Sequence, residues 1–250
     1  MKVLPRVFRL LSMAFVALLL AVEPAGAGPS ATLGAPRYRL LELDGDVVKW
    51  GRSAFGAGHV VGFAFVDRHE VAGERNCSAT KPMRALSRAS GPSPSRVRAA
   101  LLAAMSRWSA IAGIGFVESS EEEDATLLVG TFSGSAGIAF ADVSWSKSDR
   151  PGLGRLERAL ICLNANEHWT VEDDDDERTR DLHYVFAHEL GHAIGIDHPG
   201  RRGAMMASAY DEGARDFTPG DIAAARRLYG PPLGRTAVAR PLSPGDVGAR

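Results

Sequence analysis

The sequence predicts a single α/β domain, and three observations support this fold class. Apolar runs rich in Val, Ile and Phe alternate along the chain with segments whose apolar residues recur at helical spacing. The chain has 250 residues, a length that suits one domain or at most two small ones. Hydrophobic residues make up 45% of it and charged residues 24%, which is ordinary for a globular protein with a buried core.

Five strands are expected from apolar, β-rich runs that end at polar or turn residues. They cover residues 60–66, 114–117, 125–132, 137–145 and 158–163. The polar, proline-containing stretch 68–95 is expected to be a long loop. The acidic run 172–177 is expected to be a solvated loop or helix start, with a cation site as the alternative.

Three helices are expected, at residues 95–113, 182–194 and 218–230. In the first, Ser95 is the expected cap, Gly113 the expected end, and an apolar stripe that includes Trp108 forms one face. In the last, Thr218 is the expected cap and Pro219 lies in the first turn, where a missing N–H costs no hydrogen bond.

The first 27 residues are expected to be a signal peptide rather than part of the fold. Three basic residues precede an apolar run over residues 10–22, and Ala25-Gly26-Ala27 has the small-residue pattern of a cleavage site. The alternative is a membrane anchor, but the run is shorter than the ~20 residues that span a bilayer. We therefore expect a secreted protein, extracellular or periplasmic, without a stable membrane anchor.

Charge and cysteine content exclude several classes of function. The net charge of −1 provides no strong field that would attract nucleic acid or an anionic membrane. The two cysteines are too few for a disulfide scaffold or a four-cysteine zinc site. We therefore expect no nucleic-acid partner.

The most informative segment is His-Glu-Leu-Gly-His-Ala-Ile-Gly-Ile-Asp-His at residues 188–198. On a helix, His188 and His192 lie four residues apart, so both imidazoles project from one face and can share one metal ion. Glu189 lies next to the first of them, where it can reach a water on the metal without binding the metal itself. The alternative, a helix with unrelated surface histidines, leaves this spacing to chance.

The end of this segment offers a third ligand. Gly195 can adopt the left-handed conformation that ends a helix and turns the chain. The turn lets His198 supply a third nitrogen. Three histidines leave one tetrahedral position open, which is typical of a catalytic rather than a structural zinc site.

Residues 188–198 match the zinc-binding consensus of the metzincin metallopeptidases, so the chain resembles that family. Metzincins also have a tight turn with a methionine beneath the zinc. Gly203-Ala204-Met205-Met206 looks like this Met-turn, with Met206 as its methionine. Met205 is the weaker candidate, and an ordinary core methionine is the alternative for Met206.

Within the metzincins, the chain is most similar to the matrixins, over residues 47–230. The matching pieces are Lys49-Trp50, Trp108, His168-Trp169-Thr170, Phe186-Ala187, Asp221-Ile222 and Leu228-Tyr229-Gly230. The resemblance implies one metzincin-like catalytic domain: a twisted mixed sheet of about five strands, a long first helix, a zinc-binding active-site helix and a C-terminal helix. Residues 231–250 are expected to be a flexible tail. Residues 28–46 contain no cysteine, so we expect a bacterial-type member without a pro-domain cysteine switch.

Some positions depart from the matrixin pattern. Pro199 replaces the usual serine, and Ala207-Ser208 replaces the usual Tyr-Pro after the turn methionine. Phe140 and Cys162 align with two histidines of the second, structural zinc of matrixins. We therefore expect one catalytic zinc ion per chain. Calcium is possible but unsupported, and Asn164 and Glu167 are the nearest candidate ligands.

The two cysteines allow three interpretations. Export makes a disulfide possible, and a Cys77–Cys162 bond is the favoured one. Two unpaired thiols are the second, and a latency role for Cys77 is the third.

The resemblance implies a secreted zinc-dependent endopeptidase that hydrolyses internal bonds of a protein or peptide substrate. A metal-activated water would attack the peptide bond, with Glu189 as general base. The substrate would pair with an edge strand at Gly137, Ile138 and Ala139, and Tyr210 would line the specificity pocket. We expect a monomer.

Three alternatives remain open. One is a catalytically weak zinc-binding protein that acts as a binding module. Another is a zinc hydrolase of non-peptide amides. The third is a gluzincin-type peptidase, in which a downstream glutamate would replace His198 as the third ligand.

Overall fold

A computed structural model describes residues 37–67, 75–77, 79–89, 91–135, 137–172, 178–200, 202–211 and 215–234. These residues belong to one compact unit, residues 35–250. The predicted signal peptide, residues 173–177 of the acidic run and residues 235–250 of the predicted tail lie outside the described residues. A search of the described helices finds none with the length and apolarity that a membrane span needs.

The elements alternate as the α/β prediction requires. The strands are β1 (Arg39–Leu40), β2 (Glu42–Leu43), β3 (Asp46–Lys49), β4 (His59–Phe65), β5 (Ile114–Glu118), β6 (Leu127–Phe132), β7 (Ala139–Lys147), β8 (Leu153–Asn164), β9 (His168–Thr170), β10 (Thr179–Asp181) and β11 (Ile196–Asp197). The helices are η1 (Met83–Ala89), α1 (Pro94–Ile111), η2 (Glu122–Asp124), α2 (Leu182–Ala193) and α3 (Pro219–Tyr229).

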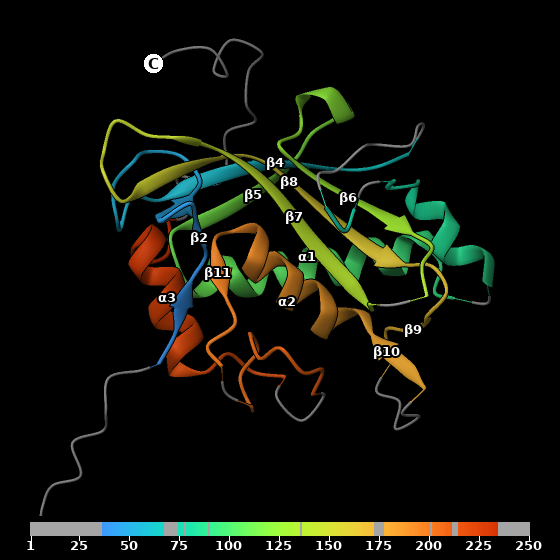
Figure 1. The fold of residues 1–250 in the computed structure, drawn as a ribbon. Coiled ribbons are helices and arrows are strands. Elements are labelled where there is room, and N and C mark those ends of the chain that lie inside the picture. The colour runs from blue at the N-terminus through green and yellow to red at the C-terminus, as the bar shows by residue number, and fades with distance from the viewer. Residues whose placement is uncertain are drawn as a thin grey trace, which may run out of the picture. The chain divides into compact units, whose positions relative to one another are not determined.

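A mixed sheet forms the framework of the fold (Figure 1). Strands β8, β6, β4 and β5 pair in that order, all parallel. Among the described strands, β7 pairs antiparallel with β8 alone and forms one edge of the sheet. These are the five predicted strands; β3 and β2 add to the same sheet beside the first residues of β8. The mixed α/β fold class is thereby confirmed.

Side chains alternate between the two faces of this sheet, as a period of two requires. Leu127 and Val129 of β6 point into the main core, whereas Leu128 between them belongs to a smaller cluster on the opposite face. Helices α1 and α2 pack together within the main core (Figure 1). The Trp108 indole of α1 donates a hydrogen bond of 2.8 Å to the Ala187 carbonyl of α2, which ties the two helices together.

The smaller cluster contains the disulfide between Cys77 and Cys162 (S–S 2.06 Å, Cα–Cα 5.8 Å). Cys162 faces Phe140 across the β7–β8 ladder, and Phe140 contacts Phe132 at 5.4 Å between ring centroids. The two positions that align with histidines of a second zinc in matrixins are therefore neighbours here, within an apolar cluster.

We predict that the purified, unfolded and non-reduced protein contains no free thiol. The disulfide links residues 85 apart, so its loss in a Cys77→Ala, Cys162→Ala variant should lower the free energy of unfolding by ~2–4 kcal/mol. A thiol titration and a urea denaturation series measure the two effects. Two free thiols per wild-type chain would contradict the pairing.

Some predicted helix and loop boundaries were wrong. Helix α1 begins at Pro94 with Ser93 as its cap, rather than after Ser95, since the fixed φ of proline suits the first helical turn. It ends at Ile111, before Gly113. The predicted long loop contains η1 and a bridge between Lys81 and Thr131. Thr218 was correctly identified, because it forms a capping box with Asp221.

Candidate metal centre

Helix α2 carries two of the three histidines, and local interactions define both of its ends. At its start, the Asp181 carboxylate accepts a hydrogen bond of 2.8 Å from the His183 amide, as an N-cap does. After its last residue, Gly195 has φ +94°, a conformation that L side chains rarely adopt. A Cβ there would also overlap the Val48 carbonyl, so both the backbone conformation and the lack of space require glycine.

Three hydrogen bonds from other elements fix this turn. The Trp50 indole donates to the Ala193 carbonyl at 2.8 Å, and the Tyr229 hydroxyl donates to the Ile194 carbonyl at 2.7 Å. The Leu41 amide donates to the Gly195 carbonyl at 2.9 Å. Strand β1 then pairs with β11, which leads directly to His198. The chain therefore returns toward α2 along a defined path.

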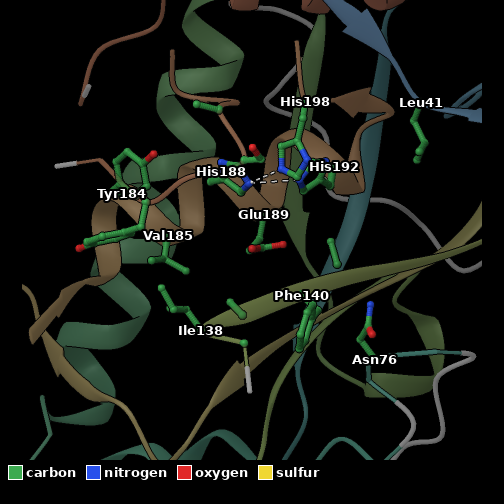
Figure 2. Close-up of a pocket in the computed structure, with 16 residues that line it drawn as sticks. Leu41, Asn76, Ile138, Phe140, Tyr184, Val185, His188, Glu189, His192 and His198 are labelled. Atoms are coloured by element: carbon green, nitrogen blue, oxygen red, sulfur yellow. Dashed lines mark hydrogen bonds between the residues drawn. The ribbon is translucent and has the colours of Figure 1, made fainter. Parts of the chain in front are cut away.

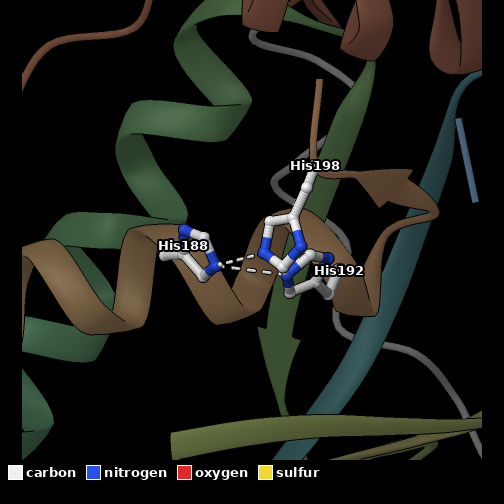
Figure 3. A group of neighbouring side chains, drawn as sticks. All are labelled: His188, His192 and His198. Atoms are coloured by element: carbon white, nitrogen blue, oxygen red, sulfur yellow. Dashed lines mark hydrogen bonds between the residues drawn. The ribbon is translucent and has the colours of Figure 1, made fainter. Parts of the chain in front are cut away.

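The three histidines converge on one point. Their Nε2 atoms are 3.1 Å apart between His188 and His192, 3.2 Å between His188 and His198, and 3.1 Å between His192 and His198. Figures 2 and 3 show the three rings facing one another above the end of α2. Among the described residues, they form the only group of three or more potential ligands close enough to hold a metal ion.

Hydrogen bonds at the other ring nitrogens set the tautomer. Nδ1 of His188 lies 2.8 Å from the Met205 carbonyl, and Nδ1 of His192 lies 2.8 Å from the Ile196 carbonyl. A carbonyl only accepts, so each Nδ1 carries the hydrogen and each Nε2 presents a lone pair to the centre. Lone pairs this close repel one another unless a cation lies between them, so the donor set fits a metal ion.

The distances suit zinc. A tetrahedral zinc ion bonds to histidine nitrogens at ~2.0–2.1 Å, which sets the nitrogens ~3.3 Å apart. The observed separations of 3.1–3.2 Å are close to that value. Loss of hydration lowers the pKa of His188 to about 4 and that of His192 to about 3. Both rings are therefore neutral at pH 7, which is the form that binds metal.

Glu189 lies beside the histidines but outside their triangle. Its side chain is buried, and Figure 2 shows its carboxylate between the histidine rings and β7. Burial raises the pKa of this carboxyl group to about 8. A carboxyl group in this position can exchange a proton with a molecule bound at the centre.

A pocket of about 510 Å³ opens over the histidines. Its walls include the sequence-predicted cleft residues Gly137, Ile138, Ala139 and Tyr210, together with Glu189. Strand β7 forms one wall, and its outer edge has no strand partner in the described part of the chain. The structure thus brings the predicted cleft residues and the three histidines to one cavity.

Met206 lies fully buried against the helix that carries the first two histidines. A Cβ at Gly191 would overlap the Met206 sulfur and crowd the Trp108 ring, so this glycine admits the methionine. The neighbouring Met205 contributes through its backbone, because its carbonyl holds His188. Both residues of the sequence-predicted turn therefore contact the histidine helix.

We predict that Gly191→Ala destabilises the protein although alanine favours helices. The overlap should cost ~1–3 kcal/mol, which exceeds the gain of ~1 kcal/mol from helix propensity. Urea denaturation measures the difference. In a Met206→Ala background the same substitution should be neutral or stabilising, and equal destabilisation in both backgrounds would contradict this explanation.

The structure shows further buried polar residues that support the site, to which the sequence assigned no role. Lys49 is 1% exposed, and its ammonium donates to the carbonyls of Trp50, Arg52 and Ala57 at 2.7, 2.9 and 3.3 Å. Lysine is almost never fully buried, so its role could not be predicted from residue type. Asp142 is another such residue; its carboxylate binds the backbone of residues 75–77.

The two candidate calcium ligands are engaged in other contacts. The Asn164 amide nitrogen donates to the carbonyls of Gly134 and Gly137, at 3.2 and 2.9 Å, and its oxygen accepts from the Asn166 amide. Glu167 pairs with Arg180 at 3.2 Å. Asn164 therefore holds the loop that precedes β7.

Comparisons with known proteins agree with the geometry. A sequence model of the peptidase M10 family, described as matrixin, matches residues 84–230, more than half of the chain. Metalloendoproteinase 1-MMP of Arabidopsis thaliana is 32% identical over 137 residues, 51% of this chain and 36% of that protein. Probable matrix metalloproteinase 095L of Invertebrate iridescent virus 3 is 31% identical over 132 residues, 50% of this chain and 35% of that protein.

Human matrix metalloproteinase-19 is 30% identical over 150 residues, 55% of this chain and 27% of that protein. The chain thus spans only about a third of the length of the curated relatives it matches. The matched segment contains α1, the strands of the sheet from β5 onward, all three histidines and α3. The chain belongs to the matrixin family of metzincins.

Proposed function

We propose that this protein is a zinc-dependent endopeptidase that hydrolyses internal bonds of protein or peptide substrates. One observation carries the proposal: three converging histidine nitrogens and a buried glutamate lie at the floor of a pocket beside an open strand edge. The matrixin family membership and the similarity to named metalloproteinases support it.

His188, His192 and His198 would hold the zinc ion. When bound there, zinc would supply Lewis-acid chemistry, lowering the pKa of a water molecule toward ~7 and polarising the carbonyl of the bond to be cleaved. Burial alone raises the pKa of Glu189 to about 8, and a zinc cation beside it would favour the ionised form. This carboxylate would act as general base, taking the proton from the attacking water and transferring it to the leaving amine. Met206 acts as the methionine of the Met-turn and supports the histidine helix from below.

Strand β7 would bind the substrate. Its outer edge is open within the described residues, and residues 137–141 face the pocket that contains Glu189. An extended peptide can add to such an edge by main-chain hydrogen bonds, with its side chains in pockets on either side. Tyr210 and Tyr184, whose rings lie 5.0 Å apart, form one end of the cavity.

Secretion is part of the proposal. The basic, apolar and small-residue pattern of residues 1–27 supports a signal peptide. The Cys77–Cys162 disulfide agrees with it, because such bonds persist in oxidising compartments.

Removal and return of the metal tests the activity. The protein loaded with zinc should cleave casein or an internally quenched peptide, lose this activity in a chelator, and regain it when zinc is restored. A folded protein that binds zinc but cleaves neither substrate would favour the alternative, a zinc-binding module. The buried carboxyl group of Glu189 beside the histidines favours the enzyme.

A further inference from the structure

The pocket has two chemically different ends, with the histidines between them. Figure 2 shows Tyr184, Val185 and Ile138 on one side of the histidines, and Leu41 and Asn76 on the other. Neither Leu41 nor Asn76 comes from α2 or β7. Leu41 belongs to the segment that also holds the Gly195 turn, whereas Asn76 belongs to a segment that is attached to β7 and β8 instead.

Asn76 lies on a segment that is anchored from two directions. The Asp142 carboxylate, 7% exposed, accepts hydrogen bonds from the amides of Arg75, Asn76 and Cys77 at 2.9, 3.3 and 2.9 Å. Three N–H donors compensate the cost of burying this charge. The disulfide to Cys162 attaches the same segment to β8. The backbone of Asn76 is therefore fixed relative to the β7–β8 pair.

The side chain of Asn76 is exposed and makes no hydrogen bond to the described part of the chain. Leu41, the other residue labelled at this end of the pocket in Figure 2, is apolar, so the Asn76 carboxamide adds a polar group to that end. A carboxamide both donates and accepts hydrogen bonds. A fixed backbone reduces the entropy that such a group loses when it binds a ligand.

We infer that Asn76 is a specificity-determining residue, which hydrogen-bonds an uncharged polar residue of the substrate on the N-terminal side of the cleaved bond. This inference rests on the proposed endopeptidase function. Strand β7 runs from Ala139, at the pocket, toward Asp142, which holds the Asn76 segment. Antiparallel strand pairs outnumber parallel ones about two- to three-fold, so we take the peptide to pair antiparallel to β7. Its N-terminal half then lies at Asn76 and its C-terminal half at Tyr184.

A peptide-library cleavage profile of the full chain tests this assignment. We expect Asn76→Leu to lose the preference for Ser, Thr, Asn or Gln at one position N-terminal to the cleaved bond, by about 2–10-fold, the worth of one hydrogen bond. Asn76→Asp should shift the same position toward Lys and Arg by about 2–5-fold, as a partly exposed ion pair allows. Preferences on the C-terminal side should not change.

Ser120→Asp is the control, because it adds a negative charge at an exposed position that does not line the pocket. Its profile should equal that of the wild type. Identical profiles for wild type and both Asn76 variants would overturn the inference and leave the endopeptidase intact. A uniform loss of rate without a change at one position would also overturn it, because that is the effect of a merely structural residue. A zinc-loaded wild type that cleaves no library peptide would overturn both proposals.

Discussion

Glu189→Gln should leave zinc bound and lower kcat/KM by ~10²-fold or more. Glutamine has nearly the same shape as glutamate, so the buried side chain fits the same space. It cannot take up a proton, and the water would have to lose its proton to solvent. Elemental analysis of the dialysed protein and the rate of cleavage of a quenched peptide measure the two properties.

Glu118→Gln is a suitable control, because Glu118 lies at the end of β5 and pairs with Arg98 outside the pocket. Its activity should equal that of the wild type. If the Glu189 variant retains activity within a few fold of the wild type, Glu189 is not the general base.

His192→Ala should abolish both tight zinc binding and cleavage. His192 supplies one of three nitrogens, and its loss leaves two ligands, too few to hold zinc in competition with water. Mutation of a residue that only hydrogen-bonds a metal ligand typically lowers metal affinity ~10–100-fold. Removal of the ligand itself should therefore lower zinc affinity by more than ~100-fold. A competition titration with a chromogenic chelator measures the affinity.

His183→Ala is the matched control for this variant. His183 lies on the same helix, but it is not part of the three-histidine group. It should bind zinc as tightly as the wild type. Tight zinc binding by the His192 variant would show that the metal is held elsewhere, in a place that the described residues do not reveal.

The metal centre was predictable because the residues that form it are close together in the sequence. His188, His192 and the turn glycine lie within eight residues on one helix and its end, so helical spacing alone brings the ligands together. The position of His198 depends on the turn after the helix. A glycine at position 195 predicts this turn, because glycine readily adopts a positive φ. The five main strands were also predictable, because their apolar residues follow the period of two.

The features that could not be predicted depend on contacts between segments that are distant in the sequence. Strand β3 forms because residues 47–49 pair with residues 153–155, and no local pattern shows that partner. The buried Lys49 donates hydrogen bonds to carbonyls of the segment that follows it, and these bonds help to shape that segment. Asn76 is held at the pocket because Asp142, 66 residues away, and the Cys77–Cys162 disulfide fix its segment. Residue type alone predicts none of these positions.

Product analysis of a peptide that is blocked at both ends shows whether the protein hydrolyses internal peptide bonds. The protein used should be folded and carry one zinc ion per chain by elemental analysis. We expect two fragments whose masses add up to the peptide plus one water molecule, and with Glu189→Gln the same fragments formed ~10²-fold or more slowly. A set of blocked peptides and casein that stay intact with this zinc-loaded wild type would contradict this expectation.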